Sequence, residues 1–512
     1  MSPLSRRSFL AGVSALAAKP AFGQGAAAPG APSADMDVMI VGAGAAGIAA
    51  ARRLSAAGRS FTLVEATSRI GGRCFTDTRS FSVPFDRGAH WIHSPDINPL
   101  TKLASRTGLD IYQAPSGQRV RIGQRNAREG ELEDYLSAVV RSNRAIGDTV
   151  RGKPDMDCQR ALPRDLGEWQ ATVEFALGPY GAGKELREMS ALDFSKSAER
   201  DAGAFCRQGY GALLAKLAEG IPVELESPVT AVDTSRGARV EATTPRGTIS
   251  ARYMIMTAST NVLASDRIKF DKGALPKRQL DALAALKLGS LDHIALDLPG
   301  NPLGLQRDDL VFEKSSGIRT AALLANISGT SLAVIEVGGR FGRELMAQGD
   351  MASVDFAVEW LTNLFGNNVK RAVQRTQSTR WNNEPWIQGA MSTASPGGQW
   401  ARAALREPVR DRIYFAGEAT HETQWGTVGG AWESGERAAD QVLRRLSGLP
   451  DLPPPKPEPE PVQPPPRGAT TVAAKPAPKP EPAAKSKSKP KSKSSSSGSG
   501  SKSKSTSKRR QR

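Results

Sequence analysis

The sequence predicts an α/β fold with a Rossmann-like nucleotide-binding domain, and three features near the start of the folded region support this prediction. An apolar strand at 37–41 runs into a glycine-rich turn, the turn opens a helix of small residues at 48–57, and a second strand at 61–64 ends on an acid. This order is typical of a dinucleotide site. A little over 400 residues lie between the two ends of the chain, enough for two domains with large cores.

Each part of the first motif has a physical purpose. Gly42 permits a tight turn, Gly44 lets the backbone approach a pyrophosphate, and Gly47 lets the helix pack closely on the strand. The helix N-terminus faces the phosphate charge. Glu65 follows Gly47 by 18 residues, where a carboxylate can accept hydrogen bonds from both ribose hydroxyls. By itself this motif leaves nicotinamide and flavin dinucleotides equally open.

The N-terminus is typical of a twin-arginine export signal at residues 1–23. Arg6 and Arg7 precede a mildly apolar stretch at 11–18, and small residues at 21 and 23 suit a signal peptidase. The alternative is a disordered tail that happens to contain two arginines. No other stretch approaches 18 uninterrupted apolar residues, so we expect no transmembrane helix. The prediction is a bacterial periplasmic or secreted protein that uses the twin-arginine export machinery.

The C-terminal segment at 448–512 is predicted to be a disordered tail, first proline-rich and then rich in lysine and serine. Residues 451–512 carry 15 Lys and Arg against 4 Asp and Glu, which accounts for most of the net charge of +17. The folded body therefore gives no sign of a nucleic-acid enzyme. The tail could bind anionic surfaces or polymers, or it could only increase solubility.

The cysteines do not indicate a metal site or a disulfide framework. Cys74, Cys158 and Cys206 are few and widely spaced, and the chain has no CxxC or HExxH pattern. We expect buried thiols and no bound metal.

Two later segments favour a flavin. Residues 85–93 form a predicted short strand with a glycine break that carries Trp91 and two histidines. Residues 412–421 form an apolar strand that ends in Gly417-Glu418, and a helix follows from Ala431 to Val442. A helix start can cap a second anionic or electron-rich group, and glycines there let a flat ring approach.

With these motifs the sequence resembles the flavin-containing amine oxidase family, which includes monoamine oxidases, polyamine and spermine oxidases, L-amino-acid oxidases and a histone lysine demethylase. The matching motifs fall in family order over nearly the whole body: 65–66 with 69–73, 88–93, 208–211 opening a helix, 228–232, Trp381 with Pro385, and 416–421 with 427–428. Several separate motifs in one order are far more specific than a single glycine-rich turn.

The resemblance implies a Rossmann-like FAD-binding domain interleaved with an α+β substrate-binding domain, the arrangement of GR2-type flavoproteins. The FAD-binding domain would comprise 36–100, 205–265 and 395–447, and the substrate-binding domain 101–204 and 266–394. The resemblance places these residues at a noncovalent FAD: Gly42, Gly44, Gly47, Glu65, Ala66, Gly72, Arg73, Gly88, Ala89, His90, Trp91, Val229, Trp381, Gly417, Glu418, Thr427 and Val428.

The sequence departs from the family pattern at several positions. Many members carry a lysine that holds a water against flavin N5, and His293 occupies that position here. Histidine can also hold a water, but its charge changes near neutral pH, so we expect reoxidation or amine deprotonation to depend on pH through His293. The alternative is a strand histidine with no role. Thr67 stands where relatives often carry an arginine, and Ser259 where they carry a proline.

The substrate prediction depends on His93, which matches a histidine near the substrate amine in polyamine and spermine oxidases, and we treat it with His293 as catalytic. Monoamine oxidases carry a tyrosine where Thr427 stands and a flavin-linked cysteine near Met391, and neither is present. FAD is therefore expected to be noncovalent. Trp386, Met391 and Trp425 are candidate pocket walls, with ordinary core packing as the alternative.

The favoured function is oxidation of a polyamine-like primary or secondary amine to an imine by hydride transfer to the flavin. Oxygen would reoxidise the flavin to give hydrogen peroxide, and water would convert the imine to an aldehyde. The alternatives on the same scaffold are an L-amino-acid oxidase and a cyclic-amine oxidase of the nicotine type. More distant alternatives are a flavin desaturase or protoporphyrinogen-type oxidase, and a secreted binding protein that acts through its basic tail.

Overall fold

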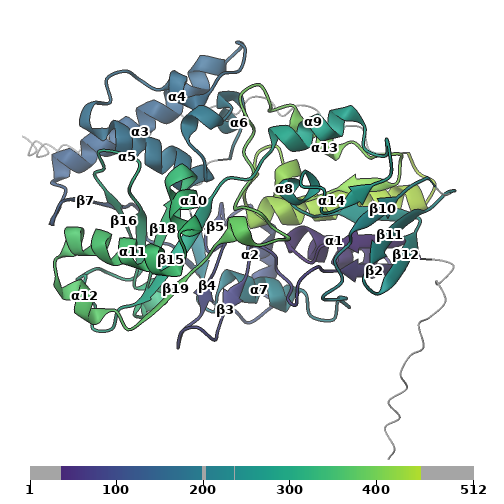
Figure 1. Cartoon of the computed structure of the whole chain (residues 1–512), viewed down its shortest axis with the longest axis horizontal. Helices are drawn as coiled ribbons and strands as arrows, with labels where there is room; N and C mark the ends of the chain where they lie inside the picture. Colours follow the sequence, from purple (N-terminus) through teal and green to yellow (C-terminus); the bar gives the residue numbers. More distant parts are fainter. Residues whose placement is uncertain (1–35, 199–202, 236, 451–512) are drawn as a thin grey trace, which may run out of the picture. The chain divides into compact units, whose positions relative to one another are not determined.

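The nucleotide-binding motif lies on a sheet of four parallel strands (Figure 1). The computed structural model describes residues 36–198, 203–235 and 237–450. The strand order is β2 (Phe61–Val64), β1 (Val38–Val41), β13 (Tyr253–Met256) and β20 (Ile413–Phe415). All four residues of β1 are apolar and buried, as expected for a parallel strand covered on both faces. The predicted α/β fold with a Rossmann-like domain is confirmed.

Two long helices pack against each other beside this sheet, α1 (Ala45–Ala56) and α14 (Val428–Leu446). Gly435 allows the close approach, because a Cβ atom there would lie 2.0 Å from the carbonyl oxygen of Ala46. Both helices begin earlier than the sequence predicted, at Ala45 and Val428. The first turn of α14 is capped by the hydroxyl of Thr427, so the helix extends back to this residue.

A seven-stranded sheet forms the second large layer of the described unit and lies in the left half of Figure 1. One of its faces packs on α10 (Gly339–Ala347), α11 (Asp350–Phe365) and α12 (Asn368–Ala372). The other face packs against Phe85 and Phe205. In order, its strands are β19 (Arg375–Ser378), β15 (Leu291–Asp297), β18 (Leu332–Gly338), β17 (Ala322–Ala325), β16 (Asp309–Glu313), β7 (Arg119–Ile122) and β8 (Arg125–Asn126).

Smaller sheets and shorter helices complete the structure. The sheets are β12 (Gly247–Ala251), β11 (Val240–Thr244), β10 (Ala231–Asp233) and β14 (Lys269–Phe270); β5 (Ile92–His93), β9 (Gly203–Cys206) and β6 (Ile111–Gln113); and β3 (Thr76–Asp77) with β4 (Phe85–Asp86). The main further helices are α2 (Pro99–Ala104), α3 (Glu129–Val150), α4 (Cys158–Ala161), α5 (Gln170–Phe175), α6 (Ala191–Ser195), α7 (Tyr210–Leu217), α8 (Thr260–Leu263), α9 (Lys277–Ala285) and α13 (Ala401–Arg406). The predicted strand at 85–93 is two short strands, β4 and β5, separated by the glycine break.

The two large sheets use different parts of the chain. Every strand of the parallel sheet comes from 36–100, 205–265 or 395–447, and every strand of the seven-stranded sheet comes from 101–204 or 266–394. Strand β14 is an exception to the expected division, because it lies after residue 265 and pairs with β10. The described residues belong to a single compact unit, so the domain boundaries stay a prediction.

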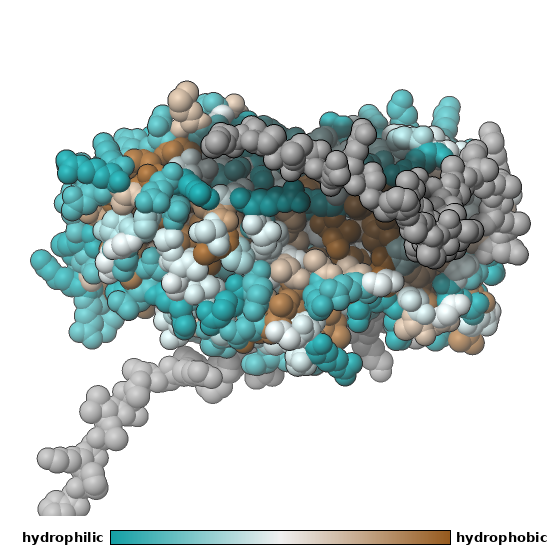
Figure 2. Space-filling model, turned by 90° about the horizontal axis from the view of Figure 1, so that it is seen from below, coloured by the Kyte–Doolittle hydropathy of each residue, from teal (hydrophilic) through white to brown (hydrophobic). Residues whose placement is uncertain are grey.

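The surface view in Figure 2 shows one face of the molecule, where apolar residues gather in a recess and hydrophilic residues cover much of the remainder. Among the residues that the structure describes, no helix combines the length and apolar character needed to cross a membrane. The predicted export signal at 1–23 and the tail from 451 lie outside the described residues.

Candidate active site

The first glycine turn leaves open space where a phosphate group can approach the backbone. A Cβ atom on Gly44 would meet no atom within 4 Å, and a Cβ on Gly72 would lie 3.6 Å from the Gly44 Cα. Gly47 is packed instead, because its Cβ would lie 1.9 Å from the carbonyl oxygen of Gly42. The turn is open on its outer side and closed against the helix, as a pyrophosphate at a helix N-terminus requires.

Three donors fix the carboxylate of Glu65 at the end of β2. Its Oε2 accepts from the amide of Ala43 at 2.8 Å, and its Oε1 accepts from the amide and hydroxyl of Thr67 at 3.0 and 2.8 Å. Thr67 thus orients the acid at a position where relatives often carry an arginine. Ala66 is half-buried, and Val229 is buried in the apolar cluster that includes the end of β2. Glu65 Oε2, which accepts only one hydrogen bond among the described residues, keeps acceptor capacity for a ribose hydroxyl.

Glu418 is the second oriented carboxylate and begins the short helix η6 (Glu418–Thr420). Its Oε1 lies 2.8 Å from Nη1 of Arg73, and its Oε2 accepts from the Ser392 hydroxyl at 2.7 Å and the Gly426 amide at 2.9 Å. Burial acts to raise the pKa of Glu418, but Arg73, Ser392 and Arg402 together lower it below its usual value. The carboxylate is therefore ionised at neutral pH.

A small cleft lies beside Glu418 and is bordered by Arg73 and Thr257. Gly417 borders the cleft, and a Cβ atom on Gly417 would meet no atom within 4 Å. Thr427 caps the helix, because its hydroxyl accepts from the amide of Gly430 at 2.9 Å, and Val428 is the first helical residue. The open glycine and the helix N-terminus provide a place for an electron-rich group.

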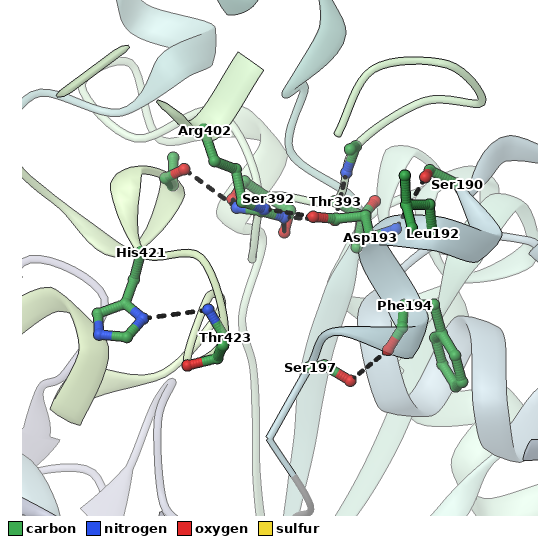
Figure 3. Close-up of polar contacts among 12 residues, drawn as sticks. Ser190, Leu192, Asp193, Phe194, Ser197, Ser392, Thr393, Arg402, His421 and Thr423 are labelled. Atoms are coloured by element: carbon green, nitrogen blue, oxygen red, sulfur yellow. Dashed lines mark hydrogen bonds and ion pairs between the residues drawn. The ribbon is translucent and has the colours of Figure 1, made fainter. Parts of the chain in front are cut away.

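A buried ion pair between Arg402 and Asp193, drawn in Figure 3, is linked to Glu418 through Ser392. Arg402 and Asp193 are 0% and 2% exposed, and their two hydrogen bonds measure 2.6 and 2.7 Å. Arg402 also donates to the Ser392 hydroxyl at 3.3 Å, and its guanidinium carbon lies 4.9 Å from the ring centre of Trp425. The network connects α6 through Ser392 to Glu418. Such bidentate pairs fix geometry as well as charge.

The segment at 87–89 passes beside Arg73 and Trp381. The amide of Ala89 donates to the carbonyl of Arg73 at 3.0 Å, and the indole nitrogen of Trp381 donates to the carbonyl of Arg87 at 3.1 Å. A Cβ atom on Gly88 would lie 3.0 Å from a ring carbon of Trp381. The structure thus brings together residues that are far apart in the sequence and that were predicted to lie along the flavin.

His90, Trp91 and His93 follow this segment, and their rings make different contacts. The Nδ1 of His90 lies 2.8 Å from Oδ2 of Asp86, and its ring lies 4.5 Å from that of Phe205. Asp86 therefore orients the His90 ring through Nδ1, while the buried Nε2 has no hydrogen-bond partner among the described residues. Trp91 and His93 have nearly parallel rings, with centroids 6.4 Å apart and planes 11° apart. They form one aromatic unit near β5.

His293 lies on β15, on the face of the seven-stranded sheet that packs against Phe85. Alternate residues of a strand share a face, and Ala295 belongs to the same apolar cluster as Phe85. The Nδ1 of His293 lies 3.1 Å from the Asp86 carbonyl oxygen, and its Nε2 lies 3.2 Å from Oε1 of Glu336. Both ring nitrogens are therefore engaged, so the expectation that one of them holds a water is not met in this structure.

The three predicted pocket walls lie in different surroundings. Trp425 is 2% exposed beneath Arg402, so in this structure it packs against the ion pair. Trp386 packs on the core beneath the parallel sheet. The side chain of Met391 contacts Gly426, at 3.3 to 3.5 Å from a Cβ built there, which places it beside the start of α14.

Sequence reasoning missed the charged partners of these residues. Glu336 lies in the otherwise apolar strand β18 and is 5% exposed, and a lone carboxylate in such a run is a signal that could have identified it. Arg402 and Asp193 gave no comparable signal, because each lies in a mixed segment of the sequence. All three cysteines are buried and free, and the described ranges contain no cluster of His, Cys, Asp or Glu that could hold a metal ion.

Comparison with known proteins gives a consistent result. Residues 45–443 match the model of a family described as flavin containing amine oxidoreductase. Lysine-specific histone demethylase 2 of Homo sapiens is 28% identical over 439 residues, covering 79% of this chain and 53% of that protein. This chain therefore spans about half the length of that relative. Polyamine oxidase 4 of Oryza sativa subsp. japonica is 27% identical, and the match covers 81% of this chain and 91% of that protein.

Solved structures show the same fold at lower identity. Cyclohexylamine oxidase from Brevibacterium oxydans superimposes with a TM-score of 0.68 at 21% identity, covering 81% of this chain and 100% of that one. Putrescine oxidase bound to putrescine superimposes with a TM-score of 0.68 at 19% identity, and the superposition covers 80% of this chain and 99% of that one. These likenesses support the fold of the described region.

Proposed function

Because this chain belongs to the family of flavin-containing amine oxidoreductases, we propose that it is an FAD-dependent oxidase of a primary or secondary amine, with polyamines favoured. FAD, held noncovalently, would accept a hydride from the carbon that bears the amine and pass the electrons to oxygen, which yields hydrogen peroxide. The imine is then hydrolysed by water to an aldehyde. The named relatives include proteins that act on polyamines and on putrescine.

The observation that carries the proposal is a pair of oriented carboxylates, each close to a glycine that is open on its outer side. Glu65 is fixed for a ribose by Ala43 and Thr67, and Glu418 is held ionised beside Arg73. Gly44 follows Ala43, and its open side gives the backbone room to meet a pyrophosphate. The residues present therefore fit FAD.

The charge near His293 favours an amine over an amino acid. Glu336 is buried beside His293, and the Tyr180 hydroxyl faces it from another element. The Glu336 carboxylate would attract a cationic amine and repel a substrate carboxylate.

Anaerobic reduction of the flavin tests this function directly. The purified protein, loaded with FAD, is mixed without oxygen with putrescine, spermidine, cyclohexylamine and a set of L-amino acids while flavin absorbance is followed. We expect bleaching with amines and none with amino acids, and hydrogen peroxide once oxygen is admitted. A colourless protein, or a yellow protein that no amine bleaches, would refute the proposal.

We also propose that the protein is exported by the twin-arginine machinery and that its basic tail binds anionic surfaces. Arg6 and Arg7 support the first part and the 15 Lys and Arg of residues 451–512 support the second. Cell fractionation with the Arg6→Lys/Arg7→Lys variant tests export, and binding to anionic vesicles after deletion of residues 450–512 tests the tail. Export of the double variant, or unchanged vesicle binding by the deletion, would contradict these proposals.

A further inference from the structure

His293 and Glu336 face each other across two neighbouring strands. β15 and β18 are antiparallel, and their register places these two residues directly opposite. Both are 5% exposed. Side chains in directly opposite positions on one face of a sheet are close enough to interact, and here His293 Nε2 lies 3.2 Å from Glu336 Oε1. The fold itself therefore creates this contact.

The partners of the ring determine where its protons lie. The Asp86 carbonyl can only accept a hydrogen bond, so His293 Nδ1, 3.1 Å away, must carry a proton. An ionised carboxylate also only accepts, so Nε2 carries a second proton when Glu336 is charged. With two acceptors and two donors the ring is an imidazolium. A neutral ring would require the proton to lie on Glu336 instead.

The surrounding groups favour the charged ring. Burial acts to lower the pKa of His293, but the hydrogen bond and charge of Glu336, then the Asp86 carbonyl and the charge of Asp292, raise it above its usual value. Three acidic residues surround the ring: Glu336 on β18, Asp86 on β4 and Asp292 on β15 itself. The neighbouring strand β19 and the loop after it contribute only the hydroxyl residues Ser378 and Thr379. The hydroxyl of Tyr180, at the end of η2 (Ala176–Tyr180), faces Glu336 from a further element.

We propose that Glu336 is a positioning residue that keeps His293 as a charged imidazolium, so that the imidazolium presents the positive charge for which many relatives use a lysine. This inference rests on the proposed function, because it assigns the charge to the flavin side of the site. Asp86 precedes the segment at 87–91 that passes beside Trp381, so His293 lies next to the residues predicted to border the flavin. The sequence led us to expect that reoxidation or amine deprotonation depends on pH through His293. Under this proposal the charge of His293 instead stays constant across neutral pH.

The protonation state can be read without any amine turnover. The chain has only four histidines, so nitrogen NMR of the FAD-loaded protein with ¹⁵N-labelled histidine gives four pairs of imidazole nitrogen signals, and the His293→Gln variant identifies the pair from His293. We expect this ring to be doubly protonated in the wild type at pH values above the usual histidine pKa of about 6.5, because Glu336 raises the pKa of His293. In Glu336→Gln we expect its proton affinity to fall at least tenfold.

A second histidine and carboxylate pair provides a matched control. His421 Nε2 lies 2.9 Å from Glu433 Oε2 on the more exposed side of α14, so Glu433→Gln removes an equivalent partner and must leave the His293 signal unchanged. A neutral His293 ring in the wild type at about pH 7, close to the unperturbed pKa of about 6.5, would overturn the proposal. So would an imidazolium that persists in Glu336→Gln.

The wild-type measurement decides the inference even where the variant folds poorly. It is also independent of the proposed function. If amines fail to bleach the flavin, the amine oxidase proposal fails while the NMR signal still reports the pair; if amines bleach the flavin and the His293 ring is neutral, only this inference fails.

Discussion

Asp292 is a buried acid next to His293 in β15. Replacing it by asparagine tests quantitatively how much the burial of its charge costs in stability. The side chain is 0% exposed. Its Oδ1 accepts from the Trp381 amide at 2.8 Å and the Thr379 hydroxyl at 2.9 Å, while its buried Oδ2 has no hydrogen-bond partner among the described residues. Burial raises the pKa of Asp292 from 3.8 to about 6. The substitution Asp292→Asn keeps the Oδ1 acceptor and removes the charge.

The magnitude follows from the shift in pKa. The folded protein binds the Asp292 proton more tightly than the unfolded chain does, so ionisation of this group costs nothing below pH 3.8 and an increasing amount up to about pH 6. A rise from 3.8 to about 6 corresponds to about 3 kcal/mol at neutral pH. Asparagine carries no such cost. We therefore expect Asp292→Asn to gain about 2–3 kcal/mol relative to the wild type between about pH 4.5 and about pH 7.5.

The assay is urea unfolding of the wild type and Asp292→Asn at saturating FAD, at both pH values. Asp297, which ends the same strand and accepts from the Ser331 hydroxyl at 2.6 Å, is half-buried and provides the control. Asp297→Asn makes the same chemical change in the same strand and controls for the general effect of replacing a carboxylate by an amide. A stability difference for Asp292→Asn that is the same at both pH values would refute the reasoning.

Two further predictions concern packing and the buried ion pair. Gly47→Ala places a Cβ 1.9 Å from the Gly42 carbonyl oxygen and is expected to abolish FAD retention. In α3, the Cβ of Gly147→Ala lies 4.0 Å from its nearest neighbour, the Cβ of Ser195, and this control is expected to stabilise the protein by about 0.5–1 kcal/mol. Yellow Gly47→Ala protein with wild-type thermal unfolding would contradict the first part. Arg402→Met leaves the Asp193 charge without its ion-pair partner and is expected to lower the free energy of unfolding by about 3–5 kcal/mol, measured with denaturant. Adding Asp193→Asn is expected to restore part of this stability. Losses of stability that simply add in the double variant would contradict this prediction.

The sequence was most informative where function depends on the order of neighbouring residues. Gly42, Gly44 and Gly47 could be assigned because a turn between a strand and a helix imposes local requirements on the backbone. Glu418 and Thr427 could be placed by the same kind of local pattern, an apolar strand that ends in Gly-Glu and a later helix start. The predicted starts of α1 and α14 were late by about one turn, and for α14 the reason is that its capping threonine looks like part of the preceding loop.

Contacts between distant segments could not be predicted in this way. Arg402 bonds to Asp193 although 209 residues separate them, and nothing in either local sequence selects the other as its partner. Strand register has the same limitation, since a shift by one residue would turn every side chain of β18 to the opposite face. Apolar residues on both faces of β18 leave the sequence without the alternation that normally fixes the register.

The pairing of His293 with Glu336 also changes what the substitution of lysine by histidine means. A lysine adds one positive charge, whereas an imidazolium and a carboxylate together add none, so their effect at a distance is that of a dipole and decreases more steeply. The imidazolium side of this pair contacts Asp86, and the carboxylate side faces Tyr180. Groups beside the 87–91 segment therefore meet the positive end of the pair first, and the Tyr180 hydroxyl meets the negative end. The pair can thus direct a positive charge toward the residues predicted to border the flavin without leaving a net charge in the core.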